Sequence, residues 1–337
     1  MFLIRQAGPV DFQGVLALAR LLDSYNLPAD KGYIRQLLRL SEDSFRGRLT
    51  RARARYLFVI EEAGIGRIVG CSLIIAKHGV PGRPHLWLGL ETVTKKSRTL
   101  HCVRSHQVLR LGYTEDGPTE VGGLVVLPGY RKRPEACGLQ ISFVRFLYMA
   151  LHPGRFEREV LVEYRGAMGA GSRSRFWESV GRLFTGLPYG KADRLSVTNK
   201  EFILNLFPRE PIYCALLPKP LQNAIGAVHP AAARAAGLLK TIGFRPMPQI
   251  EPFDGGPYYS ALRRRIRLVR ETRRFTAVAR PSLLGKPYLI GTDVGGFFRA
   301  ALAPAAVRGK RIQLEEETLE LLRVQTGDPI YACPVSR

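Results

Sequence analysis

The sequence lacks any apolar run of the length that a membrane-spanning helix needs, which is about 18 residues or more. Its longest apolar stretches, such as 57–60 and 124–127, have the length of strands. The residues after Met1 do not form a basic region followed by a long apolar one, so no secretory signal is indicated. These absences predict a soluble, cytoplasmic protein with no membrane partner.

Closely spaced cysteines are also absent. The five cysteines lie at positions 71, 102, 137, 214 and 333, and no two are within four positions of each other. A disulfide framework or a zinc site needs closer or paired spacing, so we expect free thiols and no metal. Neither Cys137 nor Cys214 has a histidine near it in the sequence, and packing is the favoured interpretation of both.

Acidic residues are scarce: 28 Asp and Glu stand against 51 Lys and Arg, which gives a net charge of +23. A positive surface field attracts polyanions, and both nucleic acid and a phosphorylated cofactor fit that description. The sequence contains no zinc finger, recognition helix or RNA-binding aromatic motif, so nucleic acid is the less favoured partner. Hydrophobic residues make up 46% and charged residues 23%, which is typical of a folded globular chain.

Hydrophobic periodicity predicts a mixed α/β chain. Strands are expected at 2–7, 56–61, 66–75, 100–111, 120–127, 159–163 and 262–270, of which 56–61 and 66–75 form a hairpin. Helices are expected after a cap at Asp11, through 34–40, and at 43–54, 138–151, 173–184, 199–207 and 230–241. We expect region 1–165 to bind a cofactor, region 166–275 to be helix-rich and complete an active site, and region 280–337 to form a small β-rich unit.

A basic loop joins the strand at 120–127 to the helix at 138–151. Arg131, Lys132 and Arg133 stand just before the helix, whose first N–H groups are unpaired and favour an anion. Gly138 would let a ligand approach the backbone closely. A pyrophosphate site and a solvated basic loop both fit this pattern.

The GNAT superfamily of acetyltransferase-like enzymes grips coenzyme A with such a strand, loop and helix. Its usual signature is Arg/Gln-x-x-Gly-x-Gly/Ala, and of those glycines only Gly138 is present here. The rest of the chain carries a longer series of motifs that resembles the arginine N-succinyltransferase family, from Ile4-Arg5 to Gly327-Asp328. The motifs are Leu124–Arg131, Ser142–Ala150, Glu163–Gly166, Phe176–Phe184, Pro211–Tyr213, Ile225–Pro230, Gly243-Phe244 and Phe253–Pro257.

This resemblance implies a GNAT-like fold, succinyl-CoA as the acyl donor and the α-amine of arginine as the acceptor, with N-succinylarginine and CoA as products. It places the catalytic histidine at His229 and an acyl-CoA contact at about Leu124. The expected acyl-CoA-binding residues are Leu124, Val125, Val126, Arg131, Lys132, Arg133, Cys137, Gly138 and Leu139. The expected acceptor-binding residues are Glu163, Arg165 and Asp254.

Each of these residues also has a structural interpretation. His229 precedes Pro230 at the start of the helix at 230–241, where the positive helix end disfavours an imidazolium. A neutral His229 could accept a proton from the amine or relay one to the thiolate, or it could simply cap the helix. Glu163 could pair with Arg165 instead of a substrate, and Asp254 beside Gly255-Gly256 could stabilise a turn.

The sequence departs from the family pattern mainly at polar, loop-like positions. The departures are Gly169 in place of an aspartate, Arg175 in Ser174-Arg175-Phe176-Trp177, Ala231 and Ala232 after His229-Pro230, and residues 22–26. Three alternatives therefore stay open: an acyltransferase for another amine, a non-catalytic partner subunit and, least favoured, a nucleic-acid-binding protein. Homo-oligomers and hetero-oligomers are both compatible with the sequence.

Overall fold

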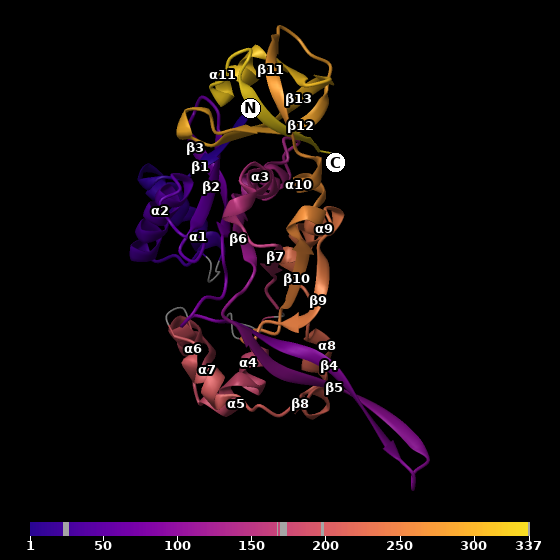
Figure 1. Ribbon diagram of the computed structural model, residues 1–337. Helices are drawn as coiled ribbons and strands as arrows, with labels where there is room; N and C mark the ends of the chain where they lie inside the picture. The colour runs from indigo at the N-terminus through magenta and orange to yellow at the C-terminus, as the bar shows by residue number, and fades with distance from the viewer. Residues whose placement is uncertain (23–26, 167, 169–173, 197–198, 336–337) are drawn as a thin grey trace. The chain divides into compact units, whose positions relative to one another are not determined.

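The structure is a computed structural model that describes residues 1–22, 27–166, 168, 174–196 and 199–335. The chain folds into two compact units made of interleaved segments (Figure 1). Unit 1 comprises Met1–Lys77, Thr119–Arg158 and Leu262–Arg337, and unit 2 comprises His78–Pro118 and Glu159–Ala261. The roles expected for regions 1–165, 166–275 and 280–337 stay predictions.

The first part of unit 1 is a sheet with helices on both faces. Its strands are β1 (Phe2–Gln6), β2 (Arg55–Glu62), β3 (Arg67–Ile75) and β6 (Thr119–Val126), paired in that order. Its helices are α1 (Phe12–Leu22), α2 (Lys31–Phe45) and α3 (Cys137–Leu151), with 3₁₀ turns at Pro9–Asp11, Pro128–Tyr130 and Pro153–Arg155. The hairpin expected at 56–61 and 66–75 is confirmed as β2 and β3.

Successive side chains of β2 and β3 point to opposite faces of the sheet, one covered by α1 and α2 and the other by α3. Leu57 and Val59 join the buried cluster under α1 and α2. On the other face, the Ser72 hydroxyl donates to the Ile141 carbonyl of α3 at 2.7 Å. The ring of Phe58 lies 5.4 Å from that of Tyr148, also on α3. The sheet is therefore buried on both faces, which explains its continuous apolar sequence.

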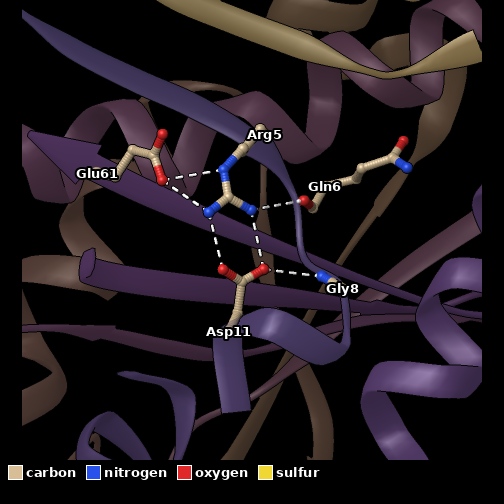
Figure 2. Close-up of polar contacts among 5 residues, drawn as sticks. All are labelled: Arg5, Gln6, Gly8, Asp11 and Glu61. Carbon is tan, nitrogen blue, oxygen red and sulfur yellow. Dashed lines mark hydrogen bonds and ion pairs between the residues drawn. The ribbon is translucent and has the colours of Figure 1, made fainter. Parts of the chain in front are cut away.

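A polar network fixes the start of the chain against this sheet (Figure 2). Arg5 on β1 forms a two-bond pair with the Asp11 carboxylate, both bonds being 2.8 Å, and its Nε donates to Glu61 on β2 at 2.9 Å. Asp11 also accepts from the Gly8 amide at 2.8 Å. Asp11 is therefore not the N-cap of α1 that the sequence predicts. Its carboxylate binds Arg5 and forms the capping box of the 3₁₀ turn Pro9–Asp11, which leads directly into α1.

The C-terminal part of unit 1 is rich in strands, as expected. It contains α10 (Arg267–Glu271), β11 (Arg273–Arg280), β12 (Lys286–Thr292), β13 (Arg299–Arg308), β14 (Arg311–Glu315), α11 (Glu316–Leu322) and β15 (Pro329–Pro334). The strands pair in the order β12-β15-β11-β14-β13, and β13 pairs again with β12, so they form a closed ring. Small side chains such as Ala301 and Ala303 fill its interior beside Ile312. A narrow ring requires small interior residues, which matches the alanine-rich sequence.

Unit 2 is a second, mostly antiparallel sheet with short helices. Its strands are β7 (Glu159–Glu163), β10 (Pro257–Leu262), β9 (Arg245–Ile250), β4 (His85–Ser97), β5 (Cys102–Thr114) and β8 (Ile212–Tyr213), in that order. Its helices are α4 (Arg175–Ser179), α5 (Gly181–Thr185), α6 (Tyr189–Ser196), α7 (Glu201–Leu206), α8 (Lys219–Ala224) and α9 (Ala233–Thr241). Trp177 is fully buried and stacks on Phe253 at 4.7 Å between ring centroids.

Two other sequence expectations are wrong. The helix expected at 43–54 does not form, because α2 ends at Phe45 and Gly47 adopts a φ of 72°, a left-handed conformation that ends helices. The strand expected at 262–270 is a 3₁₀ turn at Arg263–Arg265 followed by α10. Ile266 and Leu268 are both buried where this segment packs on α3. Two apolar residues separated by one position therefore do not distinguish a strand from a short helical segment.

The sequence does not predict four of the strands that the structure describes in unit 2: β4, β8, β9 and β10. The first of these pairs with β5 over its whole length, from His85 with Thr114 to Ser97 with Cys102. Figure 1 shows the two strands as a long ribbon. Within the described part of the chain, no helix is long and apolar enough to span a membrane.

Candidate functional site

The strand that precedes the basic loop is interrupted by a β-bulge. In the pairing of β6 with β3, Gly122 lies opposite Leu73 and Val125 opposite Cys71, so β6 carries one extra residue between them. Gly123, inside this bulge, has a φ of 55°. A bulge re-aims side chains and interrupts a hydrogen-bond ladder. The expected donor contact, Leu124, therefore lies at the irregular point of β6, while Val125 and Val126 are buried.

The cations of the loop bind the loop itself as well as facing solvent. Arg131 Nε donates to the Val126 carbonyl at 2.9 Å. Arg133 lies over the Tyr130 ring at 3.9 Å, and its Nε donates to the Gly129 carbonyl at 3.2 Å. Lys132 is exposed. Two of the three expected phosphate-binding cations thus also hold the shape of the loop.

The first turn of α3 is open beside Gly138. The helix begins after Ala136, which adopts a left-handed conformation with φ 56°. A side chain added at Gly138 would meet no atom within 4 Å, so the backbone there is accessible. Leu139 is half-buried, and Cys137 is buried. Burial raises the pKa of Cys137 to about 11, which keeps it a thiol at neutral pH and argues against a nucleophilic role.

All five cysteines are free thiols, as expected, and Cys102 is the one that is not fully buried. Burial likewise raises the pKa of Cys71 to about 12. The four buried cysteines therefore pack in the interior as small apolar side chains.

In unit 2, a tight turn of residues 251–256 holds two buried carboxylates. Glu251 Oε2 accepts from the backbone amides of Phe253 and Asp254 at 2.6 and 2.8 Å. Asp254 Oδ1 accepts from the Gly256 amide at 2.7 Å. The turn interpretation of Asp254 is therefore confirmed, since its side chain bonds a backbone group two residues on.

Asp254 also reaches the segment that follows β7. Its Oδ2 accepts from the Gly166 amide at 2.9 Å. The two backbones are in close contact: a side chain at Gly256 would lie 2.1 Å from the Tyr164 carbonyl oxygen, so only glycine fits there. This contact places Asp254 beside Glu163, Arg165 and Gly166.

His229 is joined to the same segment. Its backbone amide donates to the Arg165 carbonyl at 2.9 Å. Its Nδ1 accepts from the Ala231 amide at 3.2 Å, so the side chain caps the 3₁₀ turn Pro230–Ala232 that leads into α9. The capping interpretation is confirmed, and Nε2 is left as the nitrogen that carries the proton of a neutral ring.

The charges of this cluster influence one another. Burial raises the pKa of Glu251 well above its usual range, and the nearby charges of Glu163 and Asp254 raise it further. Burial also raises the pKa of Asp254, although two backbone amides and the charges of Arg165 and His229 act in the opposite direction. A group of carboxylates beside a histidine, with perturbed pKa values, is the kind of arrangement found at functional sites.

The structure thus brings the three residues expected to bind the acceptor, Glu163, Arg165 and Asp254, together with His229, the expected catalytic residue. It adds Glu251, which the sequence analysis missed. The signal was present as two acidic residues three positions apart ahead of a Gly-Gly pair, a spacing that suits a carboxylate-stabilised turn. The residues proposed for the donor side, 124–139, belong to unit 1. Gly169 lies outside the described residues, as do positions 23–26 of the departing stretch 22–26.

Comparison with known proteins gives a consistent result. A family model described as arginine N-succinyltransferase beta subunit matches residues 2–268. An arginine N-succinyltransferase of Yersinia pestis is 32% identical over 314 residues, which cover 90% of this chain and 89% of that protein. The chain belongs to the arginine N-succinyltransferase family.

Two further relatives cover almost the entire chain. The arginine N-succinyltransferase of Photorhabdus laumondii is 30% identical, covering 98% of this chain and 97% of its own. The solved structure of arginine/ornithine succinyltransferase subunit AI from Pseudomonas aeruginosa matches with a TM-score of 0.87 and 31% identity, over 100% of this chain and 99% of that one. The mixed α/β fold expected for this family is confirmed by that match, and membership of the family makes the chain an acyltransferase.

Proposed function

We propose that this chain transfers a succinyl group from succinyl-CoA to the α-amine of arginine. The amine nitrogen attacks the thioester carbonyl, the carbon–sulfur bond breaks, and N-succinylarginine and CoA leave. The observation that carries the proposal is the hydrogen-bonded arrangement of His229, the Arg165-Gly166 backbone and Asp254. The names of relatives that match almost the whole chain support the same activity.

For the donor, we assign acyl-CoA binding to the β6 bulge and the loop before α3. Leu124, Val125 and Val126 would lie along the acyl-pantetheine arm, and the bulge frees backbone amides that can stabilise the oxyanion. Arg131, Lys132 and Arg133 would bind the phosphates together with the first amides of α3. Cys137, Gly138 and Leu139 would contact the ligand through that open first turn.

For the acceptor, Glu163 is the carboxylate best suited to bind a cationic group. Glu163 is half-buried at the end of β7, where a ligand can reach it, whereas Asp254 and Glu251 are buried. A carboxylate and a guanidinium form strong two-bond pairs. Arg165, two residues on, would bind the carboxylate of an amino acid in the same way.

His229 is better placed to donate a proton than to accept one. Because Nδ1 already accepts from the Ala231 amide, a neutral ring carries its proton on Nε2. That N–H can donate a hydrogen bond to the tetrahedral oxyanion. As the carbon–sulfur bond breaks, Nε2 can pass its proton to the thiolate and take up the proton that the attacking amine loses, so the ring ends the reaction neutral. Of the two roles considered from the sequence, the relay of a proton to the leaving group therefore has the stronger support.

The deciding experiment is an assay of thiol release from succinyl-CoA in the presence of arginine, ornithine, lysine and a neutral amino acid. The protein's own thiols are subtracted with an amine-free blank. The proposal predicts that arginine gives the highest kcat/KM and that acetyl-CoA is a poorer donor. If the folded protein released no thiol with any amine, or if a neutral amino acid were preferred, the proposed acceptor would be wrong.

Variants of Glu163 and His229 test the assigned roles within the same assay. Glu163→Gln should raise KM for arginine by about 10-fold to 100-fold, since it removes a charge-assisted hydrogen bond, and should leave KM for succinyl-CoA unchanged. His229→Ala should lower kcat by roughly 100-fold or more, the usual contribution of a proton-transferring side chain. Measured succinyl-CoA binding without turnover in the wild-type protein would instead support the partner-subunit alternative.

A further inference from the structure

A cavity of about 400 Å³ lies in unit 1, away from the loop assigned to the acyl donor. It is lined by Gln6, Phe45, Arg46, Arg48, Tyr148, His152, Arg155, Asp293, Gly296 and Phe298. These residues come from the C-terminal ends of α2 and α3, from β1 and from the connection between β12 and β13. The donor loop precedes the other end of α3, whose 15 residues span about 22 Å.

The floor of this cavity is aromatic and rigid. Tyr148 lies 5.1 Å from Phe45 and 5.0 Å from Phe298 between ring centroids, and all three side chains are buried. Gln6 fixes the Phe298 backbone by accepting its amide at 3.1 Å. Such a floor suits the flat or apolar part of a small molecule.

The wall carries a positive charge that its neighbours only partly offset. Arg155 Nη1 donates to the Tyr148 hydroxyl at 2.6 Å and to the Phe45 carbonyl at 3.2 Å, both neutral acceptors. In the described part of the chain, no carboxylate lies within ion-pair distance of Arg155. The carbonyl end of α2 offsets only about half a unit charge.

Two more cations stand at the rim. Arg46 pairs with Glu42 at 2.7 Å and Arg48 with Asp43 at 3.2 Å. Both arginines are exposed and follow the end of α2, which carries the two carboxylates. Exposed pairs of this kind contribute little, so either guanidinium can turn toward a ligand. Among the described residues that line the cavity, Asp293 is the one carboxylate, and it is bound to His152 Nε2 at 3.2 Å.

We propose that this cavity binds a small organic anion, with a carboxylate or phosphate group held by Arg155, Arg46 and Arg48 and an apolar or planar part on the floor formed by Phe45, Tyr148 and Phe298. The site is independent of the proposed acyl transfer, because its residues lie at the C-terminal end of α3 and the residues assigned to the donor lie at the opposite end.

The test follows the ring signals of His152 by NMR while benzoate, acetate, citrate or inorganic phosphate is added at low salt. The chain has six histidines, and His229, in unit 2, serves as an internal reference. We expect a saturable shift of His152, with His229 unmoved, and tighter binding of benzoate than of acetate. Saturation by phosphate alone or by carboxylates alone would support the site and assign its charged group.

Variants then identify the cavity. Replacing Arg46 and Arg48 together by alanine should weaken binding by about ten-fold or more, the loss expected for one charge-assisted hydrogen bond. Arg39→Ala, which replaces an exposed arginine of α2 that does not line the cavity, is the matched control. Unchanged binding in Lys132→Ala would show that the probe does not bind at the donor loop. Asp293→Asn removes a negative charge and should strengthen binding.

Three results would overturn the proposal. The first is the absence of a saturable His152 shift with every probe up to roughly 10 mM. The second is equal affinity in the Arg46 and Arg48 double variant, shown to be folded by circular dichroism. The third is weaker binding in the folded Asp293→Asn variant.

Discussion

The donor loop of unit 1 and the acidic turn of unit 2 hold their charges in opposite ways. Arg131, Lys132 and Arg133 are consecutive and exposed. Their contacts include the carbonyls of Val126 and Gly129, the Tyr130 ring and, for Arg133, the Glu62 carboxylate of β2 at 3.9 Å. Glu251 and Asp254 are buried, and backbone amides from two distant segments surround them. An exposed cation keeps its hydration and costs little free energy, whereas a buried carboxylate loses its hydration and needs several hydrogen-bond donors in compensation.

This difference predicts where the molecule tolerates change. The donor loop can lose a side chain and keep its fold, because water replaces what is lost. The acidic turn cannot lose a carboxylate in this way, because its carboxylates are the acceptors for buried backbone amides. The following substitutions test that contrast, from the largest expected effect to the smallest.

Gly256→Ala should be the most damaging change. The added carbon would lie 2.1 Å from the Tyr164 carbonyl oxygen and 2.6 Å from the Gly166 amide nitrogen, so two backbone segments must separate. We expect a loss of about 3 kcal/mol or more in the free energy of unfolding. Urea denaturation measures it.

The matched control is Gly237→Ala in α9, where an added carbon meets nothing within 4 Å. It should stabilise the protein by about 0.5–1 kcal/mol through helix propensity. Similar stabilities for the two variants would mean that the 254–256 and 164–166 segments are not packed as described.

Asp254→Ala should come next. It leaves the amides of Gly166 and Gly256 without their acceptor, and each such loss costs about 1–3 kcal/mol. Because Arg165 next to Gly166 holds the His229 backbone, kcat should fall by about 100-fold while KM for the acyl-CoA stays constant. Asp254→Asn keeps one acceptor oxygen and should recover part of both losses. An unchanged kcat in the alanine variant would show that Asp254 does not help to position His229.

The sequence predicted the two halves of the site unequally. The strand, loop and helix of the donor side are contiguous, so motif and periodicity were enough to locate β6 and α3. The acidic turn depends on contacts between residues near 165, 229 and 254, which no local pattern connects. Family resemblance selected Glu163, His229 and Asp254, but it did not reveal Glu251 or the glycine contact that joins the segments.

The errors in the fold have a similar cause. The sequence predicts β5 but not its partner β4. Polar residues of β4 such as Thr94, Lys95 and Lys96 do not alternate with apolar ones, so the usual sequence signal of a strand is absent there. The stretch 262–270 was assigned as a strand because buried residues two positions apart fit either a strand or one helical turn. In both places tertiary contacts, rather than local preference, decide the structure.

Glu251→Gln should have a smaller effect, of opposite sign. Its folded pKa is raised, so the group contributes stability that is fully present below its unfolded pKa and is lost as pH rises through the folded pKa. Glutamine keeps an acceptor oxygen for the Phe253 and Asp254 amides and carries no charge. The variant should match the wild type near pH 4 and be more stable at pH 7, as measured by thermal unfolding at both pH values. A variant less stable than the wild type at pH 7 would show that the charge of Glu251 is needed.

Lys132→Ala should have the smallest effect, because its exposed ammonium acts mainly through long-range attraction to phosphates. We expect KM for the acyl-CoA to rise by a few-fold, corresponding to about 0.5–1 kcal/mol, with stability and KM for the amine unchanged. Raising the salt concentration should reduce the difference from the wild type, because ions screen exposed charges more than buried ones. Arg131→Ala, which also removes the bond to the Val126 carbonyl, should lose more affinity than Lys132→Ala and depend less on salt. If KM for the acyl-CoA changed equally in the two variants at every salt concentration, the loop contacts of Arg131 would not contribute to acyl-CoA binding beyond the effect of its charge.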